Sequence, residues 1–236
     1  MRGPVVLFQL GEAPPPVADV HGTYATWFER AWGGPLVVVD GRAPGARVDV
    51  RGAAGIVVTG SPASLVDGER APFADGAAAM VHAAHDAGTP VLGVCFGHQL
   101  LAWAFGGRVV VNPRGWEIGT HHVDVTDEGA TDPLFAGVAR RLRVNLTHRD
   151  EVVDLPAAIR VLATNPWTGV QALAIGEHLR GIQFHPEITG PIVRAYAEAR
   201  RGLLVDQDVE ALLASACDAP DAIAVLRAFR ALVERA

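Results

Sequence analysis

Short apolar runs alternate with helical stretches through the first half of this 236-residue chain, and this alternation limits the fold more than any other feature. Residues 5–10, 36–39, 55–59 and 90–94 are predicted to be strands, and residues 23–32, 74–87 and 99–105 are predicted to be helices. Buried strands that alternate with helices are typical of a parallel, doubly wound sheet. The sequence therefore predicts an α/β fold.

The pattern changes near residue 108. Six short strands separated by turns are predicted at residues 108–111, 120–126, 143–147, 160–163, 170–174 and 181–184. Few helices lie between them, so we expect an antiparallel extension of the same sheet, and residues 1–190 form one predicted domain.

The last part of the chain is predicted to be helical, over residues 191–205, 209–216 and 222–235. Ile223, Leu226, Phe229 and Val233 recur at helical spacing and give the last helix an apolar stripe. We expect residues 191–236 to pack on the same domain, with a partner interface as the alternative.

Composition excludes several function classes. The net charge of −6 does not favour binding to nucleic acid or to an anionic membrane. No run reaches the ~20 apolar residues that a membrane-spanning helix needs. The chain has no lysine, which excludes Schiff-base and P-loop lysine chemistry. With no predicted secretory signal and only Cys95 and Cys217, a cytoplasmic location without disulfides is expected.

Cys95 directly follows the predicted strand at residues 90–94 and lies between Gly93 and Gly97. A Gly-x-Cys-x-Gly turn from strand to helix permits a strained backbone that presents the thiol at the carboxyl end of a sheet. The free N–H groups of the following helix favour a thiolate there. The pattern favours a nucleophile, and a buried core cysteine is the alternative.

His185 and Glu187 lie two residues apart, with Pro186 between them. In extended backbone both side chains point to the same side. A carboxylate that orients an imidazole is the base arrangement of a nucleophilic triad. His185 also follows a predicted strand, so it is expected at the same sheet edge as Cys95.

These motifs resemble a known family. Residues 95–99 (CFGHQ), 184–187 (FHPE) and 60–62 (GSP) are similar to those of a class I glutamine amidotransferase domain with a Cys-His-Glu triad. Residues 9–14 and 147–152 are similar to free-standing glutaminases of the GMP-synthase type. The resemblance covers roughly residues 4 to 190 and implies a flavodoxin-like amidotransferase architecture.

The resemblance also implies roles for single residues. Cys95 would attack the side-chain amide of glutamine and form a thioester, while His185 would transfer protons and Glu187 would orient it. The N–H groups of Gly60 and Phe96 would bind the oxyanion, and Gln99 would hold the glutamine. No cofactor or metal is implied.

The sequence departs from the family pattern at two points. Ser61 replaces a common glycine but keeps its N–H. Arg149 stands between His148 and Asp150, where glycine is more usual, so these two residues either support the site from behind or form a surface turn. The turn-rich segment 112–119, with Trp116, is predicted either to rim the pocket or to be an exposed loop.

Three functions remain open at this stage. The first is hydrolysis of glutamine to glutamate and ammonia, with ammonia passed to a separate synthase subunit. The second is a γ-glutamyl peptidase or hydrolase that uses the same triad. The third is a non-catalytic regulatory subunit that keeps the fold.

Overall fold

The sheet of this protein has a parallel half and an antiparallel half. The computed structural model describes residues 3–235. Residues 1 and 2 of the predicted domain 1–190, and residue 236 of the predicted helical range 191–236, lie outside the described part. Nine strands within it form one sheet in the order β2-β1-β3-β4-β11-β10-β9-β6-β7. The strands are β1 (Val5–Gln9), β2 (Val37–Asp40), β3 (Gly55–Val58), β4 (Val91–Val94), β6 (Glu117–Val125), β7 (Arg141–His148), β9 (Ile159–Thr164), β10 (Ala172–Ile175) and β11 (Leu179–Ile182).

The first four strands are parallel to one another, and β10, β9, β6 and β7 extend the sheet by antiparallel pairing. The predicted α/β class and the antiparallel extension are both confirmed. Strand β11 departs from the expected antiparallel pattern, because it pairs in parallel with β4 in the middle of the sheet. Strands β5 (Arg108–Val111) and β8 (Asp150–Val153) leave the main sheet and form a separate antiparallel pair.

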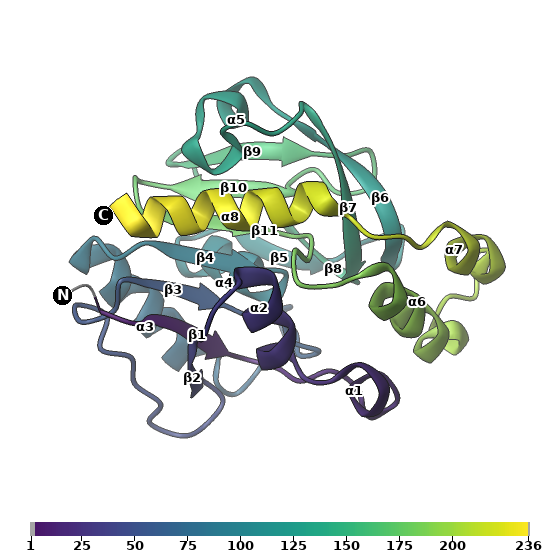
Figure 1. Ribbon diagram of the computed structural model, residues 1–236, viewed down its shortest axis with the longest axis horizontal. Coiled ribbons are helices and arrows are strands. Elements are labelled where there is room, and N and C mark those ends of the chain that lie inside the picture. The colour runs from purple at the N-terminus through teal and green to yellow at the C-terminus, as the bar shows by residue number, and fades with distance from the viewer. Residues whose placement is uncertain (1–2, 236) are drawn as a thin grey trace.

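Helices cover both faces of the sheet (Figure 1). Helices α2 (Tyr24–Trp32) and α8 (Pro220–Arg235) pack on one face, and α3 (Ala74–Ala87) and α4 (Phe96–Ala104) pack on the other. Successive side chains of a strand alternate between the faces, so Leu7 joins the first core and Val6 joins the second. The apolar runs of the sequence are therefore buried from both sides.

Helix α8 contributes to the core at the end of the chain. Val225, Leu226 and Phe229 are buried in the same cluster as the strand residues Leu7 and Val57. The Phe229 ring meets Trp32 of α2 edge to face, with 6.3 Å between centroids. The apolar stripe read from the sequence thus faces the sheet.

The other helical segments lie beyond the main sheet or connect its strands. They are α1 (Pro15–His21), α5 (Asp127–Thr131), α6 (Gly190–Ala199), α7 (Val209–Ser215) and two 3-10 turns, Pro133–Phe135 and Arg201–Leu203. The helix predicted over residues 191–205 therefore ends at Ala199, and the helix predicted to begin at Gln99 begins at Phe96.

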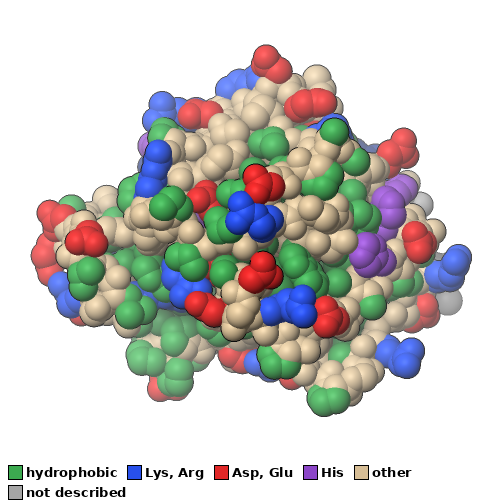
Figure 2. All heavy atoms as spheres, turned by 180° about the vertical axis from the view of Figure 1, so that it is seen from behind, with side chains coloured by type: hydrophobic (Ala, Val, Ile, Leu, Met, Phe, Trp, Pro, Cys, Tyr) green, Lys and Arg blue, Asp and Glu red, His purple; other side chains and the backbone are tan. Residues whose placement is uncertain are grey.

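The surface carries both signs of charge. Figure 2 shows arginine and acidic side chains interspersed over the face seen from behind. No helix in residues 3–235 is both long enough and apolar enough to cross a bilayer.

Candidate active site

Cys95 occupies a strained turn between β4 and α4. Its backbone has φ 53° and ψ −104°, a region that residues with a side chain rarely adopt. The residue is only 6% exposed, yet its side chain lines a pocket. Strain of this kind persists where the surrounding structure enforces it.

The two flanking glycines explain how the turn is enforced. A Cβ on Gly97 would lie 2.5 Å from the carbonyl oxygen of Val58 in β3. A Cβ on Gly93 would lie 2.4 Å from the carbonyl oxygen of Gly97. Only glycine at both positions lets α4 start this close to the strands, so the Gly-x-Cys-x-Gly pattern is a packing requirement.

His185 and Glu187 form a buried pair on the loop after β11. The imidazole Nδ1 lies 2.6 Å from Glu187 Oε1, and the His185 backbone N–H donates to the carbonyl oxygen of Asn145 in β7 at 2.9 Å. Burial alone opposes a charged imidazole, but the charges of Glu187 and Cys95 outweigh it and raise the pKa of His185 to about 10. Glu187 therefore orients the ring and favours its protonated form.

Gly60, which follows β3, marks the point where Cys95 and His185 meet. A Cβ built on Gly60 would lie 3.1 Å from His185 Cε1, 3.5 Å from Cys95 Cβ and 3.9 Å from Cys95 Sγ. The imidazole Nε2 is buried and has no hydrogen bond of ordinary geometry within residues 3–235. Nδ1 faces Glu187, so Nε2 is the ring nitrogen that is available to the Cys95 thiol.

Two backbone donors stand near the sulfur. The N–H groups of Gly60 and Phe96 have no acceptor within the described part of the chain. The Gly60 loop is fixed by Thr59, whose hydroxyl donates to the Gly60 carbonyl oxygen at 2.9 Å and accepts from the N–H of Leu10. Fixed N–H groups of this kind can stabilise a developing oxyanion.

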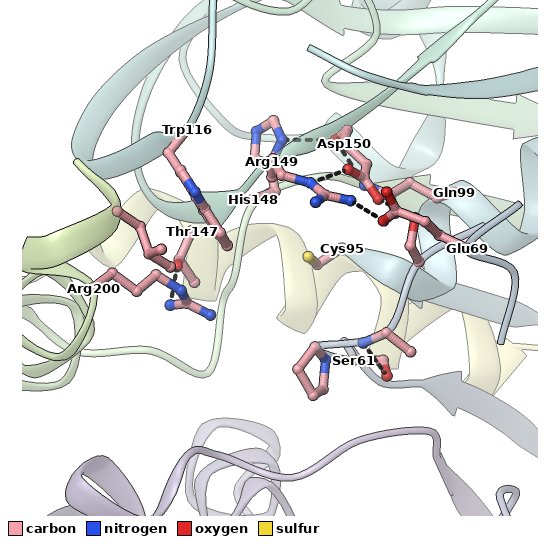
Figure 3. A pocket seen from close by; sticks show the side chains of 14 residues that line it. Ser61, Glu69, Cys95, Gln99, Trp116, Thr147, His148, Arg149, Asp150 and Arg200 are labelled. Atoms are coloured by element: carbon pink, nitrogen blue, oxygen red, sulfur yellow. Dashed lines mark hydrogen bonds and ion pairs between the residues drawn. The ribbon is translucent and has the colours of Figure 1, made fainter. Parts of the chain in front are cut away.

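The pocket beside Cys95 has a volume of about 480 Å³, and Figure 3 shows the sulfur near its centre. Its walls come from the Gly60 loop, α4, the β6 and β7 ends and the segment after α6. The lining residues are Ser61, Pro62, Ala63, Ser64, Glu69, Cys95, Gln99, Trp116, Thr147, His148, Arg149, Asp150, Arg200 and Leu203. Ser61, Gln99, His148 and Asp150, which the sequence singled out, all lie here, and so does Trp116.

His148 is held on both ring nitrogens. Nδ1 lies 2.9 Å from the carbonyl oxygen of Asp150, and Nε2 lies 2.9 Å from the carboxylate of Glu117. Burial opposes ionisation of Glu117, but the hydrogen bond and charge of His148 hold its pKa below the ordinary value. Both ring nitrogens of His148 therefore face oxygen acceptors behind the pocket wall, and these contacts fix the orientation of the ring.

Gln99 and Arg149 complete this wall. Gln99 Nε2 donates to the Asp150 carbonyl oxygen at 2.9 Å. Arg149, the departure from the family pattern, donates to Asp150 at 2.8 Å and to Glu69 at 2.7 Å, which raises its pKa. The arginine thus joins two acidic side chains at the pocket rim.

Sequence reasoning missed Arg200, which lies on the side of the pocket opposite Arg149 (Figure 3). Arg200 lies just after α6, with its guanidinium 4.6 Å from the ring centroids of both Trp116 and Tyr196. Tyr24 in α2 receives a hydrogen bond from Tyr196, and burial, chiefly, raises the pKa of Tyr24 well above its ordinary value. The only signal in the sequence was the helical spacing of Tyr196 and Arg200.

Comparison with known proteins identifies the family. The family model for class-I glutamine amidotransferases matches residues 36–192, which is more than half of the chain and includes Cys95, His185 and Glu187. The chain belongs to the class-I glutamine amidotransferases. The resemblance read from the motifs is therefore confirmed, and the family supports enzymatic activity that transfers the glutamine amide.

Relatives with curated names are similar to this class-I amidotransferase over part of their length. The chain is 38% identical over 177 residues to a glutamine-hydrolysing GMP synthase of Aeropyrum pernix. This match covers 73% of the chain and 32% of that protein. The chain is 41% identical over 102 residues to one subunit of the glutamine-hydrolysing GMP synthase of Saccharolobus solfataricus, covering 42% and 51%. The chain thus spans between a third and half of these relatives.

Solved structures share the fold over the whole chain. A glutamine amidotransferase from Thermotoga maritima has a TM-score of 0.75 and 23% identity, and covers 100% of this chain and 98% of its own. A protein from Thermoplasma acidophilum, described as a GMP synthase subunit on a provisional basis, has a TM-score of 0.68 and 18% identity, with 100% and 96% covered. This likeness confirms the flavodoxin-like amidotransferase architecture.

Proposed function

We propose that this protein hydrolyses the side-chain amide of glutamine to glutamate and ammonia through a thioester on Cys95. The observation that carries the proposal is the convergence at Gly60, where a strained cysteine, a buried imidazole and two free N–H groups meet. These are the nucleophile, base and oxyanion donors that acyl transfer requires. Family membership supports the same chemistry.

The steps follow from the geometry. His185 Nε2 holds the proton of the Cys95 thiol while the sulfur attacks the amide carbon, and the N–H groups of Gly60 and Phe96 hold the oxyanion. His185 then protonates the nitrogen as the carbon–nitrogen bond breaks, so ammonia leaves and a γ-glutamyl thioester remains. Water, activated by His185, hydrolyses the thioester to glutamate and restores the thiol.

Glu187 acts through His185. Its carboxylate, 2.6 Å from Nδ1, keeps the proton on that nitrogen and leaves Nε2 facing the thiol. It also stabilises the imidazolium that forms during each proton transfer. Gln99 and the His148–Asp150 strand end would support the glutamyl group on the pocket wall.

We further propose that the ammonia is passed to a separate synthase subunit. The support is that two relatives similar to this chain are described as single subunits of a glutamine-hydrolysing GMP synthase. Residues 36–192 match the family model of the class-I glutamine amidotransferases.

The test is release of glutamate from glutamine by the purified protein. Wild type is expected to turn over, whereas Cys95→Ala and His185→Ala are expected to lose activity almost completely and Glu187→Ala to lose less. Cys217→Ala is the matched control, because the second thiol lies outside the pocket and should not matter. Activity that survives Cys95→Ala would refute the proposal.

A further inference from the structure

Arg200 is a cation in the pocket that forms no ion pair with a carboxylate of residues 3–235. It lines the pocket and donates to the Thr147 hydroxyl at 2.6 Å. Burial, the largest influence, lowers its pKa, and the charges that act in the other direction are those of Tyr196, Tyr24 and Cys95 rather than that of a carboxylate. Burial has therefore removed water from the guanidinium, and no carboxylate of the described residues compensates for that loss.

The surroundings hold this cation in place. The guanidinium carbon of Arg200 lies over the rings of both Trp116 and Tyr196, 4.6 Å from each ring centroid. Contacts of this kind orient a guanidinium without using up its donors. With one N–H given to Thr147, the remaining donors are left for a ligand in the pocket.

The other arginine of the pocket shows the contrast. Arg149 is already paired with Glu69 and Asp150, so those charges compensate one another. Figure 3 shows this acidic group and Arg200 on opposite sides of the Cys95 sulfur. A ligand that spans the pocket therefore meets an arginine without a carboxylate partner among residues 3–235 on one side, and an arginine that is already paired on the other.

We propose that Arg200, held by its contacts with Trp116 and Tyr196, binds a carboxylate of the substrate and selects γ-glutamyl compounds that carry one at that position. The inference rests on the proposed γ-glutamyl chemistry at Cys95. The carboxylate has two sources: the α-carboxylate of the glutamyl group, or a carboxylate on the amine that leaves. In the second case the preferred substrate is a γ-glutamyl amino acid.

Binding to the inactive Cys95→Ala protein separates the two sources. The first ligand pair is L-glutamine and L-glutaminamide, which differ in the α-carboxylate. The second pair is γ-glutamylglycine and γ-glutamylmethylamide, which differ in a carboxylate on the leaving amine. Calorimetry should show that the carboxylate-bearing member of one pair binds at least tenfold more tightly, and the pair identifies the source.

The preference must depend on Arg200. Adding Arg200→Gln should remove the difference within that pair, while Arg200→Lys keeps the charge and should retain part of it. Arg201→Gln is the matched control, because Arg201 is exposed and pairs with Glu198 and Glu210 away from the pocket. It should leave the preference unchanged.

Several results would overturn the inference. They are equal binding within both pairs, a preference that survives Arg200→Gln, an equal loss of all four affinities in that variant, or no binding of any ligand. A purely structural role would lower the melting temperature of Arg200→Gln without altering the preference. Failure of the proposed function is separate, because it appears as wild type that hydrolyses none of the four compounds.

Discussion

At the scale of single residues, the site depends on the absence of a side chain at Gly60. Replacing it with alanine puts a methyl group 3.1 Å from His185 Cε1 and 3.5 Å from Cys95 Cβ. Because displacement of reacting groups by about 1 Å can cost 10²-fold in rate, we expect kcat/KM for glutamine to fall by about 100-fold. Steady-state kinetics and a thermal melt check this together.

Gly76→Ala is the control for that experiment. A Cβ on Gly76, in helix α3, would meet nothing within 4 Å. Alanine favours a helix by about 0.5–1 kcal/mol over glycine, so this variant should be fully active and slightly more stable. A Gly60→Ala protein as active as Gly76→Ala would contradict the proposed convergence.

The pKa of His185 gives a second prediction at this scale. The value of about 10 exceeds the ordinary 6.5, so the charged imidazole stabilises the fold. That contribution is fully present below pH 6.5 and is lost as the pH rises through about 10. The free energy of unfolding of wild type should therefore fall relative to that of His185→Gln between pH 7 and 10.

Urea unfolding at pH 6, 8 and 10 measures this difference. Glu187→Gln removes the carboxylate charge that raises the His185 pKa, so the decline in this variant should be smaller and should end at a lower pH than in wild type. Parallel stability curves for wild type and His185→Gln would show that the imidazole carries no such charge.

At the scale of elements, the close packing of α4 on β3 sets the position of Cys95. Gly97→Ala would place a Cβ 2.5 Å from the Val58 carbonyl oxygen, and a backbone atom in a sheet cannot move aside cheaply. Overpacking of this kind typically costs 1–3 kcal/mol, and we expect about 3 kcal/mol here. Urea unfolding compares the variant with Gly76→Ala, and an unchanged midpoint would contradict this packing.

The elements also show what the sequence could and could not predict. The parallel strands and α3 were predicted because each is a bounded apolar or periodic run. Strand β11 was predicted, but its parallel pairing with β4 was not. The two strands are far apart in the sequence, and a local residue pattern does not indicate which distant strand is the partner. Strand β8 was missed because Asp150 and Glu151 at its start resemble a polar turn.

Some residues of the candidate site were predicted from the sequence and others were not, because only some of them lie in recognisable local motifs. Cys95, His185 and Gly60 lie in short motifs with their own local chemistry. Arg200 reaches the pocket only through the packing of α6, and nothing local to it marks a binding residue. Tertiary placement, rather than residue type, decided which polar side chains face Cys95.

At the scale of the whole molecule, we propose that residues 191–236 belong to one cooperative unit with the rest of the chain. Phe229 of α8 is fully buried in the core with Leu7 and Val57. Phe229→Ala should cost about 3–5 kcal/mol and lower the stability of the entire protein in one transition. Denaturant unfolding followed by both circular dichroism and fluorescence measures this.

Arg227→Ala is the control on the same helix, because this side chain is exposed. It should change stability by no more than about 0.5 kcal/mol. Two separate transitions in Phe229→Ala, with the Cys95 site intact in the second, would show that the C-terminal helices fold as an independent unit.

The central claim is that Cys95 is the residue acylated by a γ-glutamyl substrate, and peptide mass spectrometry after treatment with a glutamine-like diazoketone tests it most directly. Acylation of Cys95 predicts one adduct, on the peptide that contains Cys95, which excess glutamine blocks and which is absent from Cys95→Ala. An adduct on Cys217, or equal labelling of wild type and Cys95→Ala, would contradict it.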